Sequence, residues 1–269
     1  MKIAILGSSL RFDILYDNLI SSGYEVTALS RVDELPEVFE HDVIVLPIPT
    51  KTKEGFLNIG GIGKITPEEL LTRTKPDALI ICCNFSDNTR KTIDLNKDEY
   101  FAFLNAIPTA EGAISIALRE KAMTMFGSKC LIVGFGRIGK ILAHRLEGLK
   151  AEITVAARNP KDLALIKALG YKEINIFSLD DALGEFDIIF QTVPTLILNE
   201  NSLSKISKTT PIIELSSAMA GTDIKKAQEL DLRVINAGGL PEKCAPQTAG
   251  MILFDSVIRI IKENHYAKN

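Results

Sequence analysis

The sequence is poor in several residue types on which common protein functions depend. Its 269 residues include no tryptophan, only three histidines and only four cysteines. The histidines lie far apart and form no metal-ligand spacing, so we expect no metal site. Three of the cysteines, Cys82, Cys83 and Cys130, lie in apolar runs typical of buried strands. We interpret them as small hydrophobic side chains in a reducing compartment, and Cys244 as a loop thiol.

The chain also lacks an excess of charge of one sign. Its formal net charge is −3, and no long run of basic residues occurs. Nucleic acids and anionic membranes are bound by concentrated basic surfaces, so this balance argues against both as partners. No apolar run reaches the roughly 18 residues that a membrane helix needs, and the first apolar stretch is too short for a signal peptide. We therefore expect a cytoplasmic protein.

What the chain does contain is an alternation of strand-like and helix-like runs. Apolar residues make up 46% of it. This alternation predicts an α/β fold with parallel sheets, and the length fits two domains. We predict a Rossmann-like domain over residues 1–108, closed by a C-terminal helix at 247–269. A second Rossmann-like domain is predicted over residues 109–246, so that two doubly wound sheets are joined by long crossover helices.

The strands predicted in the first domain are Lys2–Leu6, Glu25–Leu29, Val43–Leu46, Ala78–Cys83 and Tyr100–Leu104. Those predicted in the second are Lys129–Gly134, Glu152–Ala157, Ile174–Phe177, Asp187–Thr192, Pro211–Ser216 and Leu232–Asn236. Between the domains, Thr109 is predicted to cap a crossover helix that runs to about Met125. The segment Pro47–Lys64 is rich in glycine and lysine with little periodicity, so we expect a mobile loop. It is either a binding lid or an insertion without function.

The clearest motif is Gly-Phe-Gly-Arg-Ile-Gly at Gly134–Gly139. It follows a predicted strand and opens a predicted helix, which is the context in which G-x-G-x-x-G binds a dinucleotide. Gly134 permits the tight turn, Gly136 lets the backbone approach a pyrophosphate, and Gly139 lets the helix pack on the strand. The alternative is a glycine-rich turn without a ligand. The predicted cofactor ligands here are Gly134, Phe135, Gly136, Arg137, Ile138 and Gly139.

The end of the next predicted strand distinguishes the two nicotinamide cofactors. An NAD enzyme usually places an acidic residue there, to accept a hydrogen bond from the ribose 2′-hydroxyl. This chain has Arg158 followed by Asn159. Because a guanidinium can pair with a 2′-phosphate, we predict that the cofactor is NADP, with NAD as the alternative. Arg158 is equally explained as a solvated surface residue.

Polar and glycine-containing turns follow other predicted strands of the second domain. Thr192, Val193 and Pro194 end one strand, and Gly239 with Leu240 ends the last. Ligands of α/β sheets bind at the carboxyl ends of the strands, so we predict contacts with the nicotinamide half of the cofactor. Each segment is also explained as a structural turn.

The first domain has a single glycine in its first turn, which cannot cradle a pyrophosphate well, so we assign this domain to the substrate. Thr109 and Glu111 stand at the crossover and are further candidates. They are also explained as an N-cap and as an acid in the first turn of a helix. The predicted substrate ligands are Ser8, Ser9, Arg11, Thr50, Asn84 and Ser86.

Several of these segments, in the same order over nearly the whole chain, resemble the A subunit of bacterial dipicolinate synthase. The most specific is Ile107–Gly112, Ile-Pro-Thr-Ala-Glu-Gly, because many families share the glycine fingerprint. The chain departs from the pattern at Gly7–Ser9, where a Gly-Asp pair is expected, and at Gly238–Glu242, where Gly-Leu-Pro-Gly is expected. The segments that carry the resemblance are Asn105–Gly112, Gly134–Gly139 with Arg158, Thr192–Pro194, Gly221–Asp223 and Gly239–Pro241.

The resemblance implies an NAD(P)-dependent oxidoreductase of sporulation, in the mother-cell cytoplasm, that oxidises a dihydrodipicolinate-type ring to dipicolinate. It also implies a flavoprotein-like partner, the B subunit of the synthase, in a homo- or hetero-oligomer. The substrate is then a cyclic dicarboxylate, expected between the first domain and the nucleotide unit. Arg11 holds one carboxylate unless it is a solvated surface residue, Thr109 assists, and Glu111 is the catalytic candidate for proton removal.

Two other functions remain open. The first is an NAD(P)-dependent dehydrogenase of 2-hydroxy acids, which shares this layout but needs a histidine before the last helix. The stretch Gly238–Gln247 holds none. The second is a nucleotide-sensing module without catalysis, which would explain the glycine fingerprint but not the polar turns of the first domain.

Overall fold

The computed structural model describes residues 1–29, 35–59, 64–216 and 219–266. The chain forms two compact units. Unit 1 comprises Met1–Asn105 and Ala245–Asn269, and unit 2 comprises Ala106–Cys244. In the described residues each unit is a parallel sheet flanked by helices, so the predicted α/β class is confirmed. The unit boundaries lie a few residues before the predicted ones at 108 and 246.

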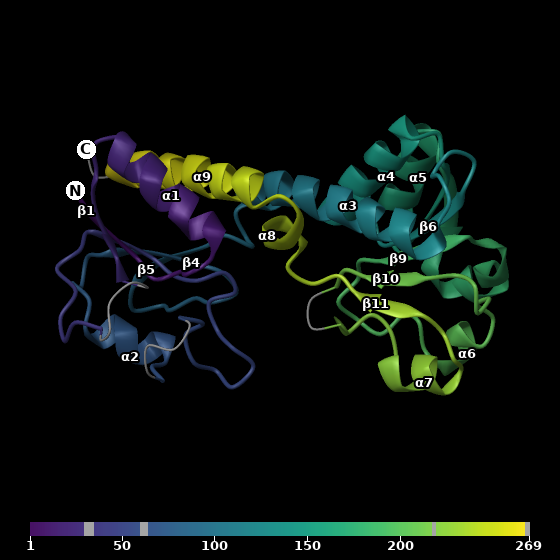
Figure 1. Cartoon of the computed structure of the whole chain (residues 1–269), viewed down its shortest axis with the longest axis horizontal. Coiled ribbons are helices and arrows are strands. Elements are labelled where there is room, and N and C mark those ends of the chain that lie inside the picture. The colour runs from purple at the N-terminus through teal and green to yellow at the C-terminus, as the bar shows by residue number, and fades with distance from the viewer. Residues whose placement is uncertain (30–34, 60–63, 217–218, 267–269) are drawn as a thin grey trace. The chain divides into compact units, whose positions relative to one another are not determined.

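Unit 1 contains, over the described ranges, a five-stranded sheet in the order β2-β1-β3-β4-β5. Every pairing in it is parallel. Figure 1 shows α1 and α9 lying side by side over one face of this sheet. Helix α2 packs on the opposite face. Its elements are β1 (Lys2–Ile5), α1 (Leu10–Ser21), β2 (Glu25–Ala28), β3 (Val43–Val45), α2 (Pro67–Thr72), β4 (Leu79–Cys82), β5 (Lys91–Asp94), the start of α3 (Glu99–Lys121) and α9 (Pro246–Tyr266).

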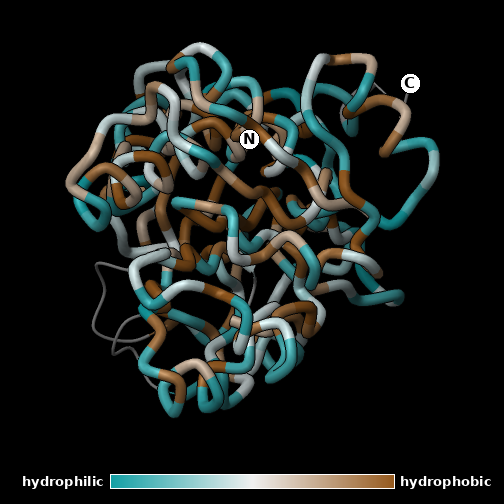
Figure 2. The backbone as a smooth tube through the Cα atoms, turned by 90° about the vertical axis from the view of Figure 1, so that its right-hand side faces the viewer, coloured by the Kyte–Doolittle hydropathy of each residue, from teal (hydrophilic) through white to brown (hydrophobic). Residues whose placement is uncertain are grey.

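The three central strands of unit 1, β1, β3 and β4, are apolar on both faces. In β1, Ile3 and Ile5 join the core under α1 and α9, whereas Ala4 joins the core on the opposite face. Successive side chains of a strand point to opposite faces, so a strand covered on both sides needs a continuous apolar run. Figure 2 shows apolar stretches of the backbone towards the middle of the view and hydrophilic stretches mainly in the outer loops.

Close packing of α1 against α9 depends on Gly250. A Cβ at this position would lie 2.6 Å from the Cβ of Ile14 and 3.0 Å from the carbonyl oxygen of Arg11. Both distances are shorter than ordinary van der Waals contact. The N-terminal part of α9 therefore packs directly on the first turns of α1.

Unit 2 contains, among its described residues, a six-stranded parallel sheet in the order β11-β10-β9-β6-β7-β8. Helices α3 and α4 contribute to the core on one face, and α6 and α7 to the core on the other. Its elements, after the remainder of α3, are β6 (Lys129–Val133), α4 (Arg137–Gly148), β7 (Glu152–Ala157), α5 (Pro160–Ala168), β8 (Lys172–Asn175), the 3₁₀ turns Ile176–Asp181 and Leu183–Glu185, β9 (Ile188–Gln191), α6 (Glu200–Leu203), β10 (Ile212–Glu214), α7 (Ile224–Glu229), β11 (Val234–Asn236) and α8 (Leu240–Cys244).

The prediction was wrong at the junction between the units. Tyr100–Leu104 is not a strand but the first part of α3, which continues through Pro108 to Lys121. The helix starts earlier because Asp98 caps it: the side chain of Asp98 accepts a hydrogen bond from the backbone N–H of Phe101 at 2.8 Å. The strand that actually closes this edge of the sheet is β5, whose residues are all half-buried.

Helix α3 is long and apolar enough to cross a membrane by length and composition alone. More than half of that apolar stretch is buried inside the protein. The core helix of a soluble protein meets the same criterion, so this feature is weak evidence for a membrane span.

The segment Pro47–Lys64 is a loop, as predicted, because its described residues form no helix or strand; residues 60–63 lie outside the described residues. Lys51 and Leu57 form an isolated antiparallel bridge. The N–H of Leu57 donates to the carbonyl of Ile65 at 2.8 Å. Leu57 and Ile59 are buried in the core of unit 1. These apolar residues pack into the core of the unit, although their spacing shows no helical or strand period.

Candidate functional site

The turn between β6 and α4 is built around three glycines with different surroundings. Gly134 has a φ of 103°, and its N–H donates to the carbonyl oxygen of Ala156 at 2.8 Å. A Cβ there would lie 2.5 Å from the hydroxyl oxygen of Thr192. A Cβ on Gly139 would lie 3.1 Å from the carbonyl carbon of Gly134 and nearer still to its oxygen. Packing within the protein therefore requires glycine at both positions, whether or not a ligand binds.

Gly136 is different, because a Cβ added to it would meet no described atom within 4 Å. It is the N-cap of α4, and the first turn of this helix reads Arg137-Ile138-Gly139-Lys140 without an acidic residue. A helix N-terminus with free space and basic neighbours suits a phosphate. The residues present therefore fit the pyrophosphate of a dinucleotide.

The wall beside this turn is the segment Thr192–Pro194. The backbone N–H and the hydroxyl of Thr192 both donate to the carbonyl oxygen of Val133, at 3.0 and 2.8 Å. The N–H of Val193 donates to Oε1 of Gln191 at 2.8 Å. Thr192 and Val193 are half-buried and Pro194 is exposed. The structure thus brings this predicted segment directly against Gly134.

Arg158 follows β7, the strand that pairs with β6. It is exposed and lies at the same end of the sheet as the glycine turn, because Val133 pairs with Ala156. The side chain of Asn159 instead caps α5, accepting from the N–H of Lys161 at 2.9 Å. Of this pair, the side chain of Arg158 remains the candidate for a contact with the cofactor.

The turn after β11 contains Gly239 at a φ of 71°. The side chain of Leu240 is buried in the core of unit 2, so it supports the turn rather than faces a ligand. Nζ of Lys243 donates to the carbonyl oxygen of Gly238 at 2.6 Å. Lys243 is otherwise exposed, and this hydrogen bond closes the turn.

Unit 1 places Arg11 in the first turn of α1, next to the N-cap Ser9. Only 3% of its surface is exposed, so the alternative of a solvated surface residue is wrong. One guanidinium nitrogen donates to Oδ1 of Asn105 at 3.3 Å. Burial and then the carboxylate of Asp94 raise the pKa of Cys83 to about 12, and the charge of Arg11 opposes that rise. Arg11 therefore lies under the carboxyl end of the sheet.

The other predicted substrate ligands of unit 1 differ in accessibility. Thr50 is completely buried; its hydroxyl donates to the carbonyl of Pro47 at 3.0 Å and accepts from the N–H of Cys83 at 2.8 Å. The hydroxyl joins two loops, so we withdraw Thr50 as a substrate ligand. Ser8, Ser9, Asn84 and Ser86 are each exposed or half-buried.

The catalytic candidates on α3 are not at the glycine turn. Glu111 is exposed, and its Oε1 accepts from Nε of Arg145 at 3.1 Å. Arg145 lies in the last turn of α4, at the opposite end of that helix from Gly136. Thr109 is buried in the middle of α3, so it is not an N-cap and stands at no helix start. Neither residue is supported as a group that acts beside the cofactor turn.

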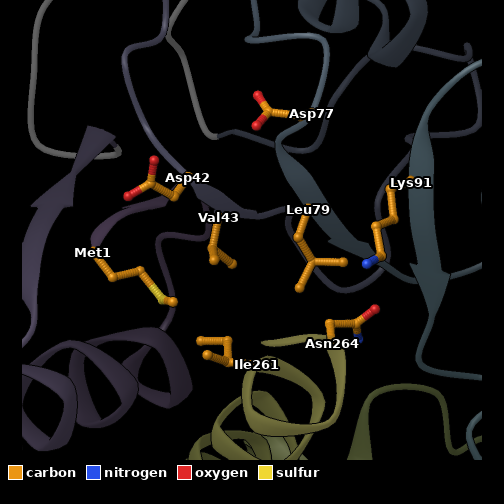
Figure 3. A pocket seen from close by; sticks show the side chains of 8 residues that line it. All are labelled: Met1, Asp42, Val43, Asp77, Leu79, Lys91, Ile261 and Asn264. Atoms are coloured by element: carbon orange, nitrogen blue, oxygen red, sulfur yellow. The ribbon is translucent and has the colours of Figure 1, made fainter. Parts of the chain in front are cut away.

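A cavity of about 370 Å³ opens in unit 1 at the amino ends of the strands, opposite the end of the sheet near which Arg11 lies. Figure 3 shows Val43 and Leu79, the first residues of β3 and β4, pointing into it above Ile261 of α9. None of the predicted ligands lines this cavity. Within the described ranges, no three His, Cys, Asp or Glu side chains cluster so that they could hold a metal ion.

Comparison with known proteins agrees with this geometry. Residues 109–220 match the NAD-binding domain of the D-isomer specific 2-hydroxyacid dehydrogenases. This match covers the glycine turn, Arg158 and the Thr192–Pro194 segment. Unit 2 is therefore similar to the nicotinamide-dinucleotide-binding domains of dehydrogenases.

The whole chain is similar to the A subunit of dipicolinate synthase from Bacillus subtilis. The alignment spans 289 positions, gaps included, with 29% identity, and it covers 98% of this chain and 96% of that protein. The crystal structure of the B. subtilis protein matches with a TM-score of 0.86 and 28% identity, over 99% of this chain and 97% of that one. The A subunit from Bacillus halodurans matches with a TM-score of 0.84 and 26% identity, over 96% and 97%. The resemblance stated from the sequence motifs is confirmed.

Proposed function

We propose that this chain is the A subunit of a dipicolinate synthase, which oxidises a dihydrodipicolinate-type ring to dipicolinate with NADP in the cytoplasm of a sporulating bacterium. The similarity over 98% of the chain to a protein of that name carries the proposal. The glycine turn supports it, because Gly136 leaves space at the start of α4 where a pyrophosphate fits. The flavoprotein-like B subunit of the synthase is the proposed partner.

The chemistry needs little from acid–base side chains. A nicotinamide cofactor bound at the glycine turn would supply the acceptor for a hydride, while a proton would leave the substrate to solvent as the substrate ring becomes aromatic. Because aromatisation supplies much of the driving force, the protein mainly binds and orients its ligands. Arg11, buried at the start of α1, is the proposed ligand of one substrate carboxylate. Ser8 and Ser9, in the same turn, are proposed to help.

The test is formation of NADPH from the dihydrodipicolinate precursor by the purified chain, with and without the B subunit. We expect turnover in at least the two-protein mixture, and none with Gly136→Val as the matched control. Absence of turnover with both NADP and NAD, when the B subunit is present, would refute the proposed reaction.

Arg158 is the proposed ligand of the NADP 2′-phosphate. Arg158→Asp removes a charge that favours a phosphate and introduces one that repels it. We expect the ratio of NADP to NAD affinity to fall by about 100-fold or more, since bidentate charged contacts contribute roughly 1.5–3 kcal/mol and repulsion adds to the loss. Unchanged NADP affinity in calorimetry would remove Arg158 from the site.

A dehydrogenase acting on 2-hydroxy acids is the second candidate, favoured by the domain match over residues 109–220. The absence of a histidine in Gly238–Gln247 argues against it. A panel of 2-hydroxy acids and 2-oxo acids, assayed with both cofactors, distinguishes the two. Turnover of any of them faster than the dihydrodipicolinate precursor would favour this second function.

A further inference from the structure

Two adjacent strands of unit 2 end in buried polar side chains that the binding of a cofactor does not by itself explain. Gln191 ends β9 and Glu214 ends β10, and the two residues are paired in register. Both are completely buried, although every other residue of these strands is apolar. A buried amide or carboxylate is costly unless it is hydrogen-bonded. Their partners therefore indicate what they do.

Gln191 joins two loops. Its Oε1 accepts from the N–H of Val193 at 2.8 Å, and its Nε2 donates to the carbonyl of Gly221 at 3.0 Å. Gly221 packs so tightly here that a Cβ would lie 2.6 Å from both Cδ of Gln191 and the carbonyl oxygen of Val193. The amide thus fixes the distance between the Thr192–Pro194 wall and Gly221.

Glu214 fixes the second of those loops at both ends. Its Oε1 accepts from the N–H of Ser216 at 3.0 Å, and its Oε2 accepts from the hydroxyl of Thr222 at 2.6 Å. The hydroxyl of Ser216 in turn accepts from the N–H of Gly221 at 3.2 Å. We name these five residues, Gln191, Glu214, Ser216, Gly221 and Thr222, the clasp.

The clasp is connected to the cofactor turn through Thr192. Thr192 is held by two hydrogen bonds to Val133 and stands where a Cβ of Gly134 would be. The clasp therefore contacts the wall that faces the glycine turn through Val193. Apolar side chains at these positions would only fill the space. The hydrogen-bonded side chains of the clasp also fix the directions of the backbone groups that they contact.

We propose that the clasp is a set of positioning residues that holds Thr192–Pro194 in place for the nicotinamide half of the cofactor. This inference rests on the proposed binding of a nicotinamide dinucleotide. The clasp acts through Val193 and Gly221, so its loss affects the nicotinamide end and leaves the adenosine and pyrophosphate contacts at Gly136 and Arg158 unchanged.

Thr222→Val tests the proposal, because valine has the shape of threonine and lacks the hydroxyl that Glu214 accepts from. Thr210→Val is the matched control. Thr210 is equally buried, and its hydroxyl donates to the carbonyl of Phe186 at 2.7 Å before β10 begins, at the amino end of that strand. Thr222→Ser retains the hydroxyl. The two probes are NADPH and 2′-phospho-ADP-ribose, which lacks the nicotinamide.

We expect Thr222→Val to weaken NADPH binding and to lower kcat, each about 5- to 10-fold, as the loss of one such hydrogen bond permits. Affinity for 2′-phospho-ADP-ribose should change less than about twofold. Thr222→Ser should restore both values, and Thr210→Val should lower thermal stability with unchanged NADPH affinity. Equal losses for both probes, or no loss for either, would overturn the proposal. If the wild-type chain binds neither probe, the proposed function itself fails.

Discussion

The three glycines of the β6–α4 turn should respond differently to substitution, because only one of them faces free space. At Gly136 the backbone has a φ of −77° and a ψ of −162°, which valine adopts readily. Loss of a favourable N-cap residue costs about 0.5–1 kcal/mol, and reduced freedom of the unfolded chain offsets about as much. Gly136→Val should therefore unfold within a few degrees of wild type.

The same substitution places two methyl groups where the pyrophosphate fits. We expect NADP affinity to fall at least about 100-fold, equivalent to roughly 3 kcal/mol. Gly139→Ala should instead lower the stability of the fold, because its Cβ meets the carbonyl group of Gly134 and this contact forces the backbone to move. Overpacking of this sort costs about 1–3 kcal/mol, and about 1 kcal/mol of gained helix propensity offsets part of this cost. The net loss is up to about 2 kcal/mol, or roughly 8 °C in a unit of this size.

The assays are calorimetric titration with NADP and thermal unfolding followed by near-ultraviolet circular dichroism. Gly136→Val should separate the two measurements, with normal unfolding and lost binding. If this variant binds NADP within about threefold of wild type, the pyrophosphate does not cross Gly136 and the placement of the cofactor is wrong. If Gly139→Ala unfolds at the wild-type temperature, the helix relaxes more easily than the packing implies.

Further predictions concern unit 1 and the cysteines. Arg11→Leu should raise the KM for the dicarboxylate about 10- to 100-fold with unchanged NADP affinity, and Arg11→Lys should recover part of the loss; a wild-type KM would move the anion site elsewhere. Thr50→Val should lower stability by about 1–3 kcal/mol, measured by urea unfolding, with no change in KM, whereas a raised KM would return Thr50 to the substrate site. Burial raises the pKa values of Cys82, Cys83 and Cys130 to about 12, so these thiols stay protonated up to pH 9 and iodoacetamide should modify only Cys244 in the native protein. Labelling of a second cysteine without denaturant, seen by mass spectrometry, would contradict the burial.

The sequence predicts most reliably what local patterns determine. The β6–α4 turn is an example, since a buried strand, three spaced glycines and an amphipathic helix are all adjacent in the chain. Tyr100–Leu104 shows the limit, because its aromatic residues favour a strand by propensity, while the cap at Asp98 and the packing of Phe101 make it a helix. The proline at position 108 resembles a helix end but lies within the helix.

The role of a polar side chain could be predicted where neighbouring residues in the sequence determine it. It could not be predicted where the hydrogen-bond partner comes from a distant part of the chain. Nothing near Thr50 indicates that its hydroxyl meets Cys83, 33 residues away. Gln191 likewise ends a strand as a polar residue, but its partner Gly221 is 30 residues away. The guanidinium of Arg11 likewise donates to Asn105, 94 residues away, so its burial could not be judged from the sequence around it.

The interruption of unit 1 by unit 2 has a consequence for the order in which the chain folds during synthesis. Residues of unit 2 are contiguous, so this unit can complete its core as soon as Cys244 has left the ribosome. Unit 1 cannot, because Leu253, Val257 and Ile261 of α9 fill the core over β1 and β3. At usual elongation rates the intervening residues, about 140, take roughly 10–30 s to synthesise. During that interval the nascent sheet of unit 1 exposes an apolar face, and this stage is where we expect a chaperone to be needed.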